Sequence, residues 1–143
     1  MKKNKQIIFD KDVGDCFRAC LTSILGIPND KELPNIDKKT WFGEWNKLLL
    51  WTGISLEFEK DRIWRTGYWI ASVPSKNFND RGHCVVMKGD NIAHDPSTHK
   101  KYKTGQSLLG KGIVDGGWYL VVDDPSKLHR LGELIDIYKK LIP

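Results

Sequence analysis

Residues 14–28 read GDCFRACLTSILGIP, and this stretch decides the fold because it encodes one complete helix with a cysteine at its start. Asp15 is a good N-cap, Gly26 supplies a C-terminal stop, and Pro28 prevents continuation of the helix. Apolar residues recur between these limits with the spacing of one helix face: Phe17, Cys20, Leu21, Ile24 and Leu25. The stretch therefore predicts a helix over residues 15–25 that carries Cys16 in its first turn.

Cys16 has the position of an activated thiol. At a helix start its sulfur would lie near unsatisfied backbone N–H groups and the positive end of the helix dipole, and both favour the thiolate. The alternative is a small buried hydrophobic residue, as most unpaired cysteines are. We favour a nucleophile because His83 and Asp95 follow downstream as a possible base and a residue to orient that base.

The segment from residue 82 to 95 predicts a β-hairpin, with strands GHCVVM at 82–87 and NIAHD at 91–95. A three-residue loop at residues 88–90 would place His83 opposite Asp95, with both side chains on one face. A two-residue loop would instead pair Cys84 with Asp95 and separate the two groups. A site made of Cys16, His83 and Asp95 therefore predicts the three-residue loop. The alternative for Asp95 is a purely turn-forming Asp-Pro.

The other two cysteines are interpreted as core residues. Cys20 follows Cys16 by one helical turn on the apolar face of the same helix. Cys84 is adjacent to His83 on a strand, so its side chain should point to the opposite sheet face, away from Cys16. Since the cysteine count is odd and no CxxC pair occurs, we expect thiols and no zinc site.

The remaining pattern predicts an α+β fold. A second helix rich in tryptophan is expected over 40–52, and further strands over 54–59, 67–73 and 117–122. A C-terminal helix of about 125–142 would begin with Pro125 at its first position. We expect one domain over residues 1–143, with an antiparallel sheet of about five strands and the last helix as an appended element.

Composition narrows the function classes. The chain has 143 residues and a net charge of +5, but its basic residues are spread along the whole sequence, so we do not expect a nucleic-acid partner. No apolar run reaches membrane-spanning length, so we expect no membrane partner. No signal-peptide hydrophobic region follows the basic N-terminus, so we expect the protein in the cytoplasm. Strand alternation turns His94 away from His83 and Asp95, and His99 lies in a polar loop, so we expect no metal and no cofactor. The oligomeric state stays open.

An acyl-transfer site also needs donors for an oxyanion. The backbone N–H of Cys16 at the helix start is the first candidate. Gln6 is the candidate for the second, since Asn4 is the only other amide side chain upstream of the thiol. Asp10 and Asp12 are closer in sequence, but their carboxylates would repel an oxyanion.

These residues together resemble the papain-like cysteine peptidase superfamily, including bacteriocin-processing peptidase domains. They are more similar still to short uncharacterised bacterial and bacteriophage proteins that have a Gly-Asn/Asp-Cys-Phe opening, a Trp-rich second helix, a Gly-His-x-Val-Val strand and a His-Asp-Pro turn. The resemblance covers roughly residues 6–122. It implies a papain-like fold with Cys16 as nucleophile, His83 as general base and acid, and Asp95 as the orienting residue. This chain departs from the family by having Asp10 where papain-like peptidases usually have the oxyanion glutamine.

The resulting expectation is a thiol hydrolase that cleaves an amide or related acyl bond, in a peptide or protein substrate, through an acyl-enzyme. Two alternatives use the same residues differently. One is transglutaminase-like acyl transfer or glutamine deamidation by the same three side chains. The other is a non-catalytic binding or effector module that retains the fold.

Overall fold

The computed structural model describes residues 1, 3, 16–28, 30–34, 36, 40–60, 67–74, 82–97, 103–107 and 116–141. The helix cap predicted at Asp15 and the oxyanion donor predicted at Gln6 lie outside these residues. The described part confirms the α+β class, with three α-helices and a five-stranded antiparallel sheet. The elements in chain order are α1 (Cys16–Leu25), η1 (Asp30–Glu32), α2 (Trp41–Leu50), β1 (Ile54–Lys60), β2 (Tyr68–Pro74), β3 (Gly82–Lys88), β4 (Asn91–His94), β5 (Gly116–Val122), η2 (Pro125–Lys127) and α3 (Arg130–Leu141).

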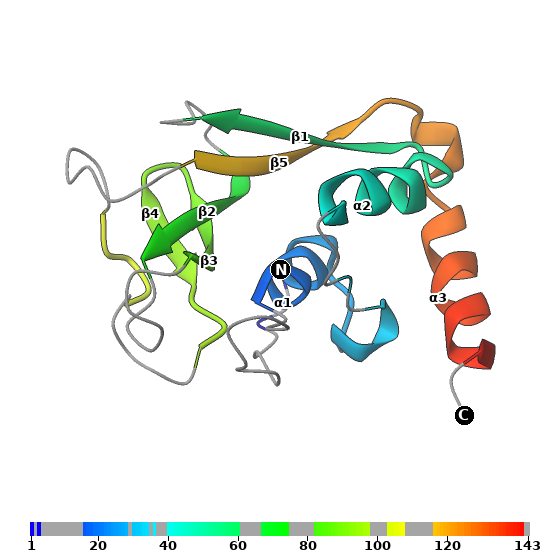
Figure 1. The fold of residues 1–143 in the computed structure, drawn as a ribbon, viewed down its shortest axis with the longest axis horizontal. Helices are drawn as coiled ribbons and strands as arrows, with labels where there is room; N and C mark the ends of the chain where they lie inside the picture. Colours follow the sequence, from blue (N-terminus) through cyan, green and yellow to red (C-terminus); the bar gives the residue numbers. More distant parts are fainter. Residues whose placement is uncertain are drawn as a thin grey trace.

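The sheet has the strand order β1-β5-β2-β3-β4. β5, the last strand in the chain, therefore lies between β1 and β2, where it pairs Trp118 with Phe58 on one side and with Ile70 on the other. α1 and α2 lie on the same side of the sheet, and α3 lies beyond them, at the end of the molecule away from β3 and β4 (Figure 1). This arrangement gives α1 the central place among the helices.

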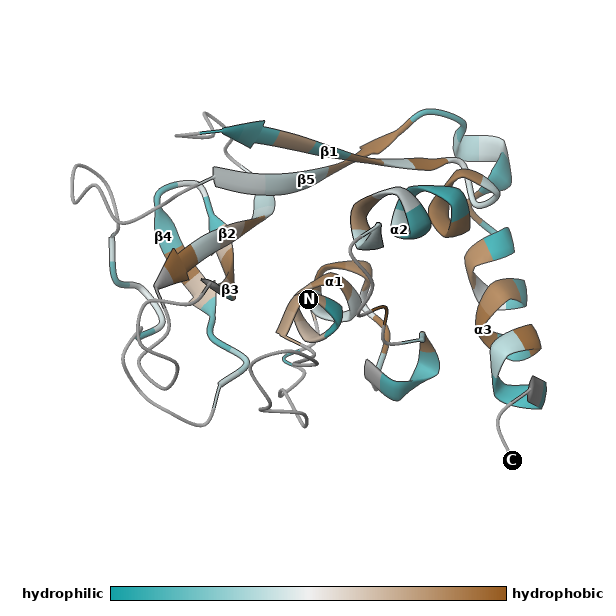
Figure 2. Cartoon of the chain, viewed as in Figure 1, coloured by the Kyte–Doolittle hydropathy of each residue, from teal (hydrophilic) through white to brown (hydrophobic). Residues whose placement is uncertain are grey.

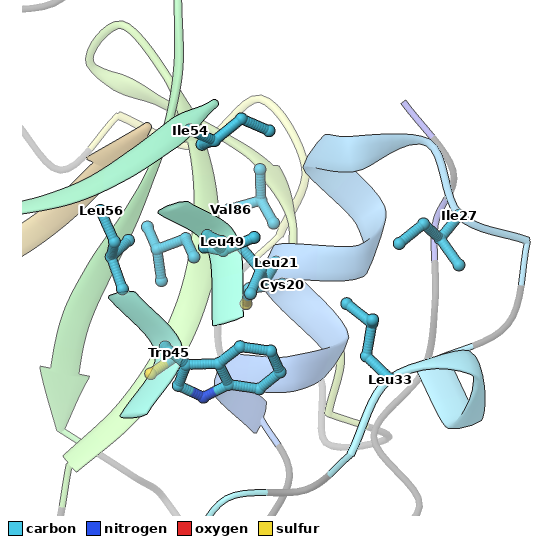
Figure 3. Close-up of a cluster of buried hydrophobic side chains, with 11 residues drawn as sticks. Cys20, Leu21, Ile27, Leu33, Trp45, Leu49, Ile54, Leu56 and Val86 are labelled. Carbon is cyan, nitrogen blue, oxygen red and sulfur yellow. The ribbon is translucent and has the colours of Figure 1, made fainter. Parts of the chain in front are cut away.

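The main core lies between the sheet and the first two helices. Its members come from α1, α2 and the inner sheet face, and Figure 3 shows Cys20 and Leu21 of α1 close to Trp45 and Leu49 of α2. A second, smaller core covers the other sheet face, with Val85 and Met87 of β3 among its members. Strand alternation explains this division, because Cys84 and Val86 of the same strand belong to the main core.

The C-terminal helix begins later than the predicted residue 125. Asp124 and Pro125 open a short 3₁₀ turn, in which the N–H of Lys127 donates to the Asp124 carbonyl at 3.1 Å, and α3 begins only at Arg130. The side chain of Asp124 accepts the backbone N–H of Ser126 and stabilises this tight turn. Leu128, the residue that ends this turn, is exposed.

α3 is a peripheral helix. Its inner residues are only half-buried against the main core: Leu131, Leu134 and Ile135. Hydrophilic and hydrophobic residues alternate along it, whereas α1 is largely hydrophobic (Figure 2). The difference follows from position, because α1 is covered by the sheet and its neighbours while α3 has solvent on its outer side.

Candidate active site

Cys16 is the first residue of α1, and the helix that carries it is firmly embedded. Six consecutive residues, 18–23, are buried. The hydroxyl groups among them are hydrogen-bonded: Thr22 Oγ1 donates to the Arg18 carbonyl at 2.8 Å, and Ser23 Oγ donates to the Ala19 carbonyl at 2.6 Å. Arg18 Nη1 also donates to the carbonyl of Leu33 at 3.2 Å, which ties the helix to the segment after η1. Cys16 is therefore the first residue of a firmly held helix, and the residue is partly exposed.

The β3–β4 hairpin does not have the predicted register. Lys88 pairs with Asn91 and Met87 with Ile92, so the loop has the two residues Gly89 and Asp90 rather than three. Gly89 has a positive φ of 59°, as a tight hairpin turn of this length requires. The prediction of a three-residue loop, with Met87 opposite Asn91 and His83 opposite Asp95, was wrong.

A β-bulge brings His83 and Asp95 together despite this turn. After Met87–Ile92 the next pair is Val86 with His94, so Ala93 is an extra residue in β4. Without the bulge the ladder would have placed Asp95 in line with Cys84. With it, Asp95 follows in line with Val85 and so shares the face of His83. The sequence pattern did not reveal the bulge, because Ala93 fits a regular strand equally well.

The imidazole of His83 is hydrogen-bonded to the carboxylate of Asp95. His83 Nε2 lies 2.7 Å from Asp95 Oδ1, and both residues are buried, with exposed fractions of 8% and 9%. The backbone N–H of Ser97 donates to the same carboxylate oxygen at 2.9 Å. This second bond fixes the carboxylate in an Asx turn after the strand, so that it holds the ring in one orientation.

Cys16 interacts with the same histidine. Because Asp95 occupies Nε2, Nδ1 is the ring nitrogen available to the sulfur of Cys16. Hydrogen bonding from Cys84 lowers the pKa of Cys16, burial opposes the shift, and the hydrogen bond and positive charge of His83 lower it further, to about 5. Burial would lower the pKa of His83, but hydrogen bonds with Asp95 and Cys16 outweigh it and raise that pKa to about 9. At neutral pH the pair is thus a thiolate and an imidazolium.

Cys84 lies on the opposite side of β3 from the one predicted. Its side chain packs in the main core below α1 and hydrogen-bonds with Cys16, and this contact, together with burial, raises the pKa of Cys84 well above its usual range. The prediction that Cys84 faces away from Cys16 was wrong, because Cys84 shares the α1-covered face with Val86. His83, the second residue of β3, also interacts with Cys16.

The other predicted residues have simpler positions. Cys20 is completely buried in the main core, which agrees with its interpretation as a packing residue. His94 is buried, with an exposed fraction of 3%. His99 and Gln6 lie outside the described residues. Among the described residues, no group of three or more His, Cys, Asp or Glu side chains could hold a metal ion.

An aromatic cluster lies directly beside the thiol. Phe17 follows Cys16 in the chain, and its ring packs edge-on against Trp41 at 4.9 Å and Trp118 at 5.4 Å between centroids. These three rings come from α1, α2 and β5 and are all half-buried. The contacts fix the first turn of α1 and leave part of each aromatic residue exposed.

Comparisons with protein-family models, with curated proteins and with solved structures gave no match to this chain. None of the helices in the described residues is long and apolar enough to cross a membrane.

Proposed function

We propose that the protein is a papain-like thiol hydrolase, in which Cys16 attacks the carbonyl of an amide or related acyl bond in a peptide or protein. The observation that carries this proposal is the continuous hydrogen-bonded arrangement of a thiol, an imidazole and a carboxylate. Asp95 orients the ring of His83 through Nε2, which leaves Nδ1 for the interaction with Cys16. A nucleophile, a base and a residue that orients the base are the parts that such chemistry requires.

The charge state of the pair defines the proposed steps. The thiolate of Cys16 adds to the carbonyl carbon, and the imidazolium of His83 then gives its proton to the leaving amine. An acyl-enzyme results. A water molecule then gives its proton to the neutral ring as it attacks the thioester, and release of the acid restores the thiolate and imidazolium.

The start of α1 supports the same chemistry. The first backbone N–H groups of a helix have no partner within it, so the N–H of Cys16 is a candidate donor to the oxyanion. The assignment of Gln6 as a second donor stays a prediction. The papain-like part of the proposal rests on one arrangement, a thiol-bearing helix packed against the antiparallel strands that carry the histidine and the carboxylate.

An activated ester tests the proposal without knowledge of the natural substrate. Incubation with p-nitrophenyl acetate should release nitrophenolate in a burst equal to the enzyme concentration, with an acetyl group on Cys16 in the intact-mass spectrum. Cys16→Ala should abolish both signals. Cys20→Ala is the matched control, because it removes a buried thiol one turn away and should retain the burst. Acetylation of wild type without dependence on Cys16, or no acetylation at all, would contradict the proposal.

The fate of the acyl group separates hydrolysis from transfer. A peptide library incubated with wild type, with and without an added primary amine, should give cleaved peptides in both cases if the enzyme is a hydrolase. Amine-modified or deamidated glutamine peptides without cleavage would instead indicate the transglutaminase-like reaction. Full biological activity of Cys16→Ala would indicate a non-catalytic binding module.

A further inference from the structure

Cys84 is a second thiol at the site, and the proposed hydrolysis has no step for it. It lies on β3 in the main core, against which Cys16 of α1 packs, and the two side chains are hydrogen-bonded. Cys84 is buried, whereas Cys16 is partly exposed. All three cysteines are in the thiol form in the structure.

We propose that Cys16 is a site of oxidation by hydrogen peroxide or a small organic hydroperoxide, and that Cys84 resolves the product as a reversible Cys16–Cys84 disulfide. The inference rests on the packing of Cys16 against the core that contains Cys84 and on the thiol form of both residues, and the lowered pKa of Cys16 supports it. It does not require that the protein hydrolyses any substrate, so it can succeed or fail independently of the proposed function.

The chemistry balances with the peroxide as the only added oxidant. The Cys16 thiolate attacks one peroxide oxygen, the O–O bond breaks, and the released hydroxide takes a proton to become water. Cys16 is then a sulfenic acid. The sulfur of Cys84 attacks that of Cys16, the S–O bond breaks, and the Cys84 proton leaves with the hydroxyl as a second water. The two thiols have together supplied the two electrons that reduce one peroxide.

Oxidation of Cys16 changes the electrostatics at Cys84 in a way that favours formation of the disulfide. Before oxidation, the hydrogen bond with Cys16 holds the proton on Cys84, and burial has the same effect. Once Cys16 is a neutral sulfenic acid, its negative charge no longer opposes ionisation of Cys84. Cys84 therefore stays unreactive while the nucleophile is reduced and becomes available when it is oxidised.

The disulfide would have two consequences for the protein. It would occupy the sulfur of Cys16 and so block any reaction at that atom. It would also protect Cys16 from irreversible sulfinic and sulfonic oxidation, since reduction of a disulfide restores the thiol. The bond would join α1 to β3, two elements that already pack together in the main core.

The test uses the full chain, treated with a small excess of hydrogen peroxide and then alkylated under denaturing conditions. Wild type should lose the mass of two hydrogens, and peptide mapping should find Cys16 joined to Cys84, with Cys20 alkylated. Dithiothreitol should restore all three thiols. Cys84→Ser keeps a hydrogen-bond donor beside Cys16 but cannot form the bond, so its Cys16 should react with dimedone and proceed to sulfinic acid. Cys20→Ser, the matched control, should form the disulfide like wild type.

Four outcomes would overturn the inference. They are a Cys16–Cys20 disulfide, sulfinic acid at Cys16 of wild type while Cys84 is alkylated, a disulfide between two molecules, and no reaction of Cys16. Because peptide mapping of wild type alone distinguishes them, the test holds even if a variant folds poorly. The acetylation burst measured on the same reduced protein shows separately whether the proposed hydrolase stands.

Discussion

Asp95 and Asp124 each begin an Asp-Pro-Ser sequence, and both segments form the same local turn. The backbone N–H of Ser97 donates to Asp95 Oδ1 at 2.9 Å, and that of Ser126 donates to Asp124 Oδ1 at 3.1 Å. What differs is the surroundings. The Asp95 carboxylate is buried against His83, whereas that of Asp124 is partly exposed and lies 3.7 Å from Lys127 Nζ.

The comparison teaches that the three-residue sequence encodes a turn and no more. The turn presents one carboxylate oxygen at a defined angle in both places. Only the first turn follows a bulged strand beside a histidine, and only there does the carboxylate raise the pKa of a base. At Asp124 the hydrogen bonds with Ser126 instead lower the pKa of the carboxyl itself. Substitutions at the two turns should therefore have unequal effects.

His83→Ala removes the imidazole that is bonded to Asp95, the group that distinguishes the Asp95 turn from the Asp124 turn. Of the substitutions compared, it should have the largest effect on the reaction. Loss of the base should lower the acylation rate about 10³-fold. The variant should also lose ~3 kcal/mol of stability, because the buried carboxylate of Asp95 is left without its partner. Ester turnover and urea denaturation measure the two effects. A rate within tenfold of wild type would exclude His83 as the base.

Asp95→Asn and Asp124→Asn form a matched pair, because asparagine can retain the turn in both places. Asp95→Asn should lower turnover about 10²-fold, since a neutral amide no longer stabilises the imidazolium of His83. Asp124→Asn should leave turnover unchanged. Equal turnover in the two variants would show that Asp95 stabilises its turn and has no role in the reaction.

The pH dependence of acylation should reflect the Cys16–His83 pair and not the second turn. Below about pH 5 the thiolate gains a proton, and above about pH 9 the imidazolium loses the one needed for the leaving group. With an amide substrate the rate should therefore fall roughly tenfold per unit outside these limits and be flat between them. Asp95→Asn should move the upper limit down, whereas Asp124→Asn should move neither limit.

Gly53→Ala perturbs the second turn and should have the smallest effect on the reaction. Gly53 has a φ of +78°, and an added Cβ would overlap the carbonyl oxygen of Asp124. The carbonyl of Gly53 also accepts the N–H groups of Asp123 and Asp124 at 2.8 and 3.1 Å. The variant should lose about 2 kcal/mol of stability. Its turnover per folded molecule should equal that of wild type, and a large drop would contradict the separation of the two regions.

Local signals in the sequence predict much of this molecule. The apolar spacing after Cys16 predicts α1, and the alternating runs predict all five strands to within one or two residues. The pairing of His83 with Asp95 was also predicted, although from the wrong register. The error at the C-terminal helix is local as well, because Pro125 is compatible with the start of either an α-helix or a 3₁₀ turn.

The parts that could not be predicted depend on tertiary contacts. Ala93 carries no mark of a bulge, because the extra residue is accommodated by how β4 lies against β3. The position of Cys84 depends on which sheet face α1 covers, and strand alternation alone cannot decide between two faces that are both apolar.

The most direct test of the account is the pKa of the Cys16 thiol, measured as the pH dependence of its alkylation by iodoacetamide in wild type and in His83→Gln. We predict a transition near pH 5 in wild type and a clear upward shift in His83→Gln, with Asp124→Asn indistinguishable from wild type. A wild-type transition near the ordinary thiol value of about 8.5, unaffected by His83→Gln, would contradict the claim that this histidine activates Cys16.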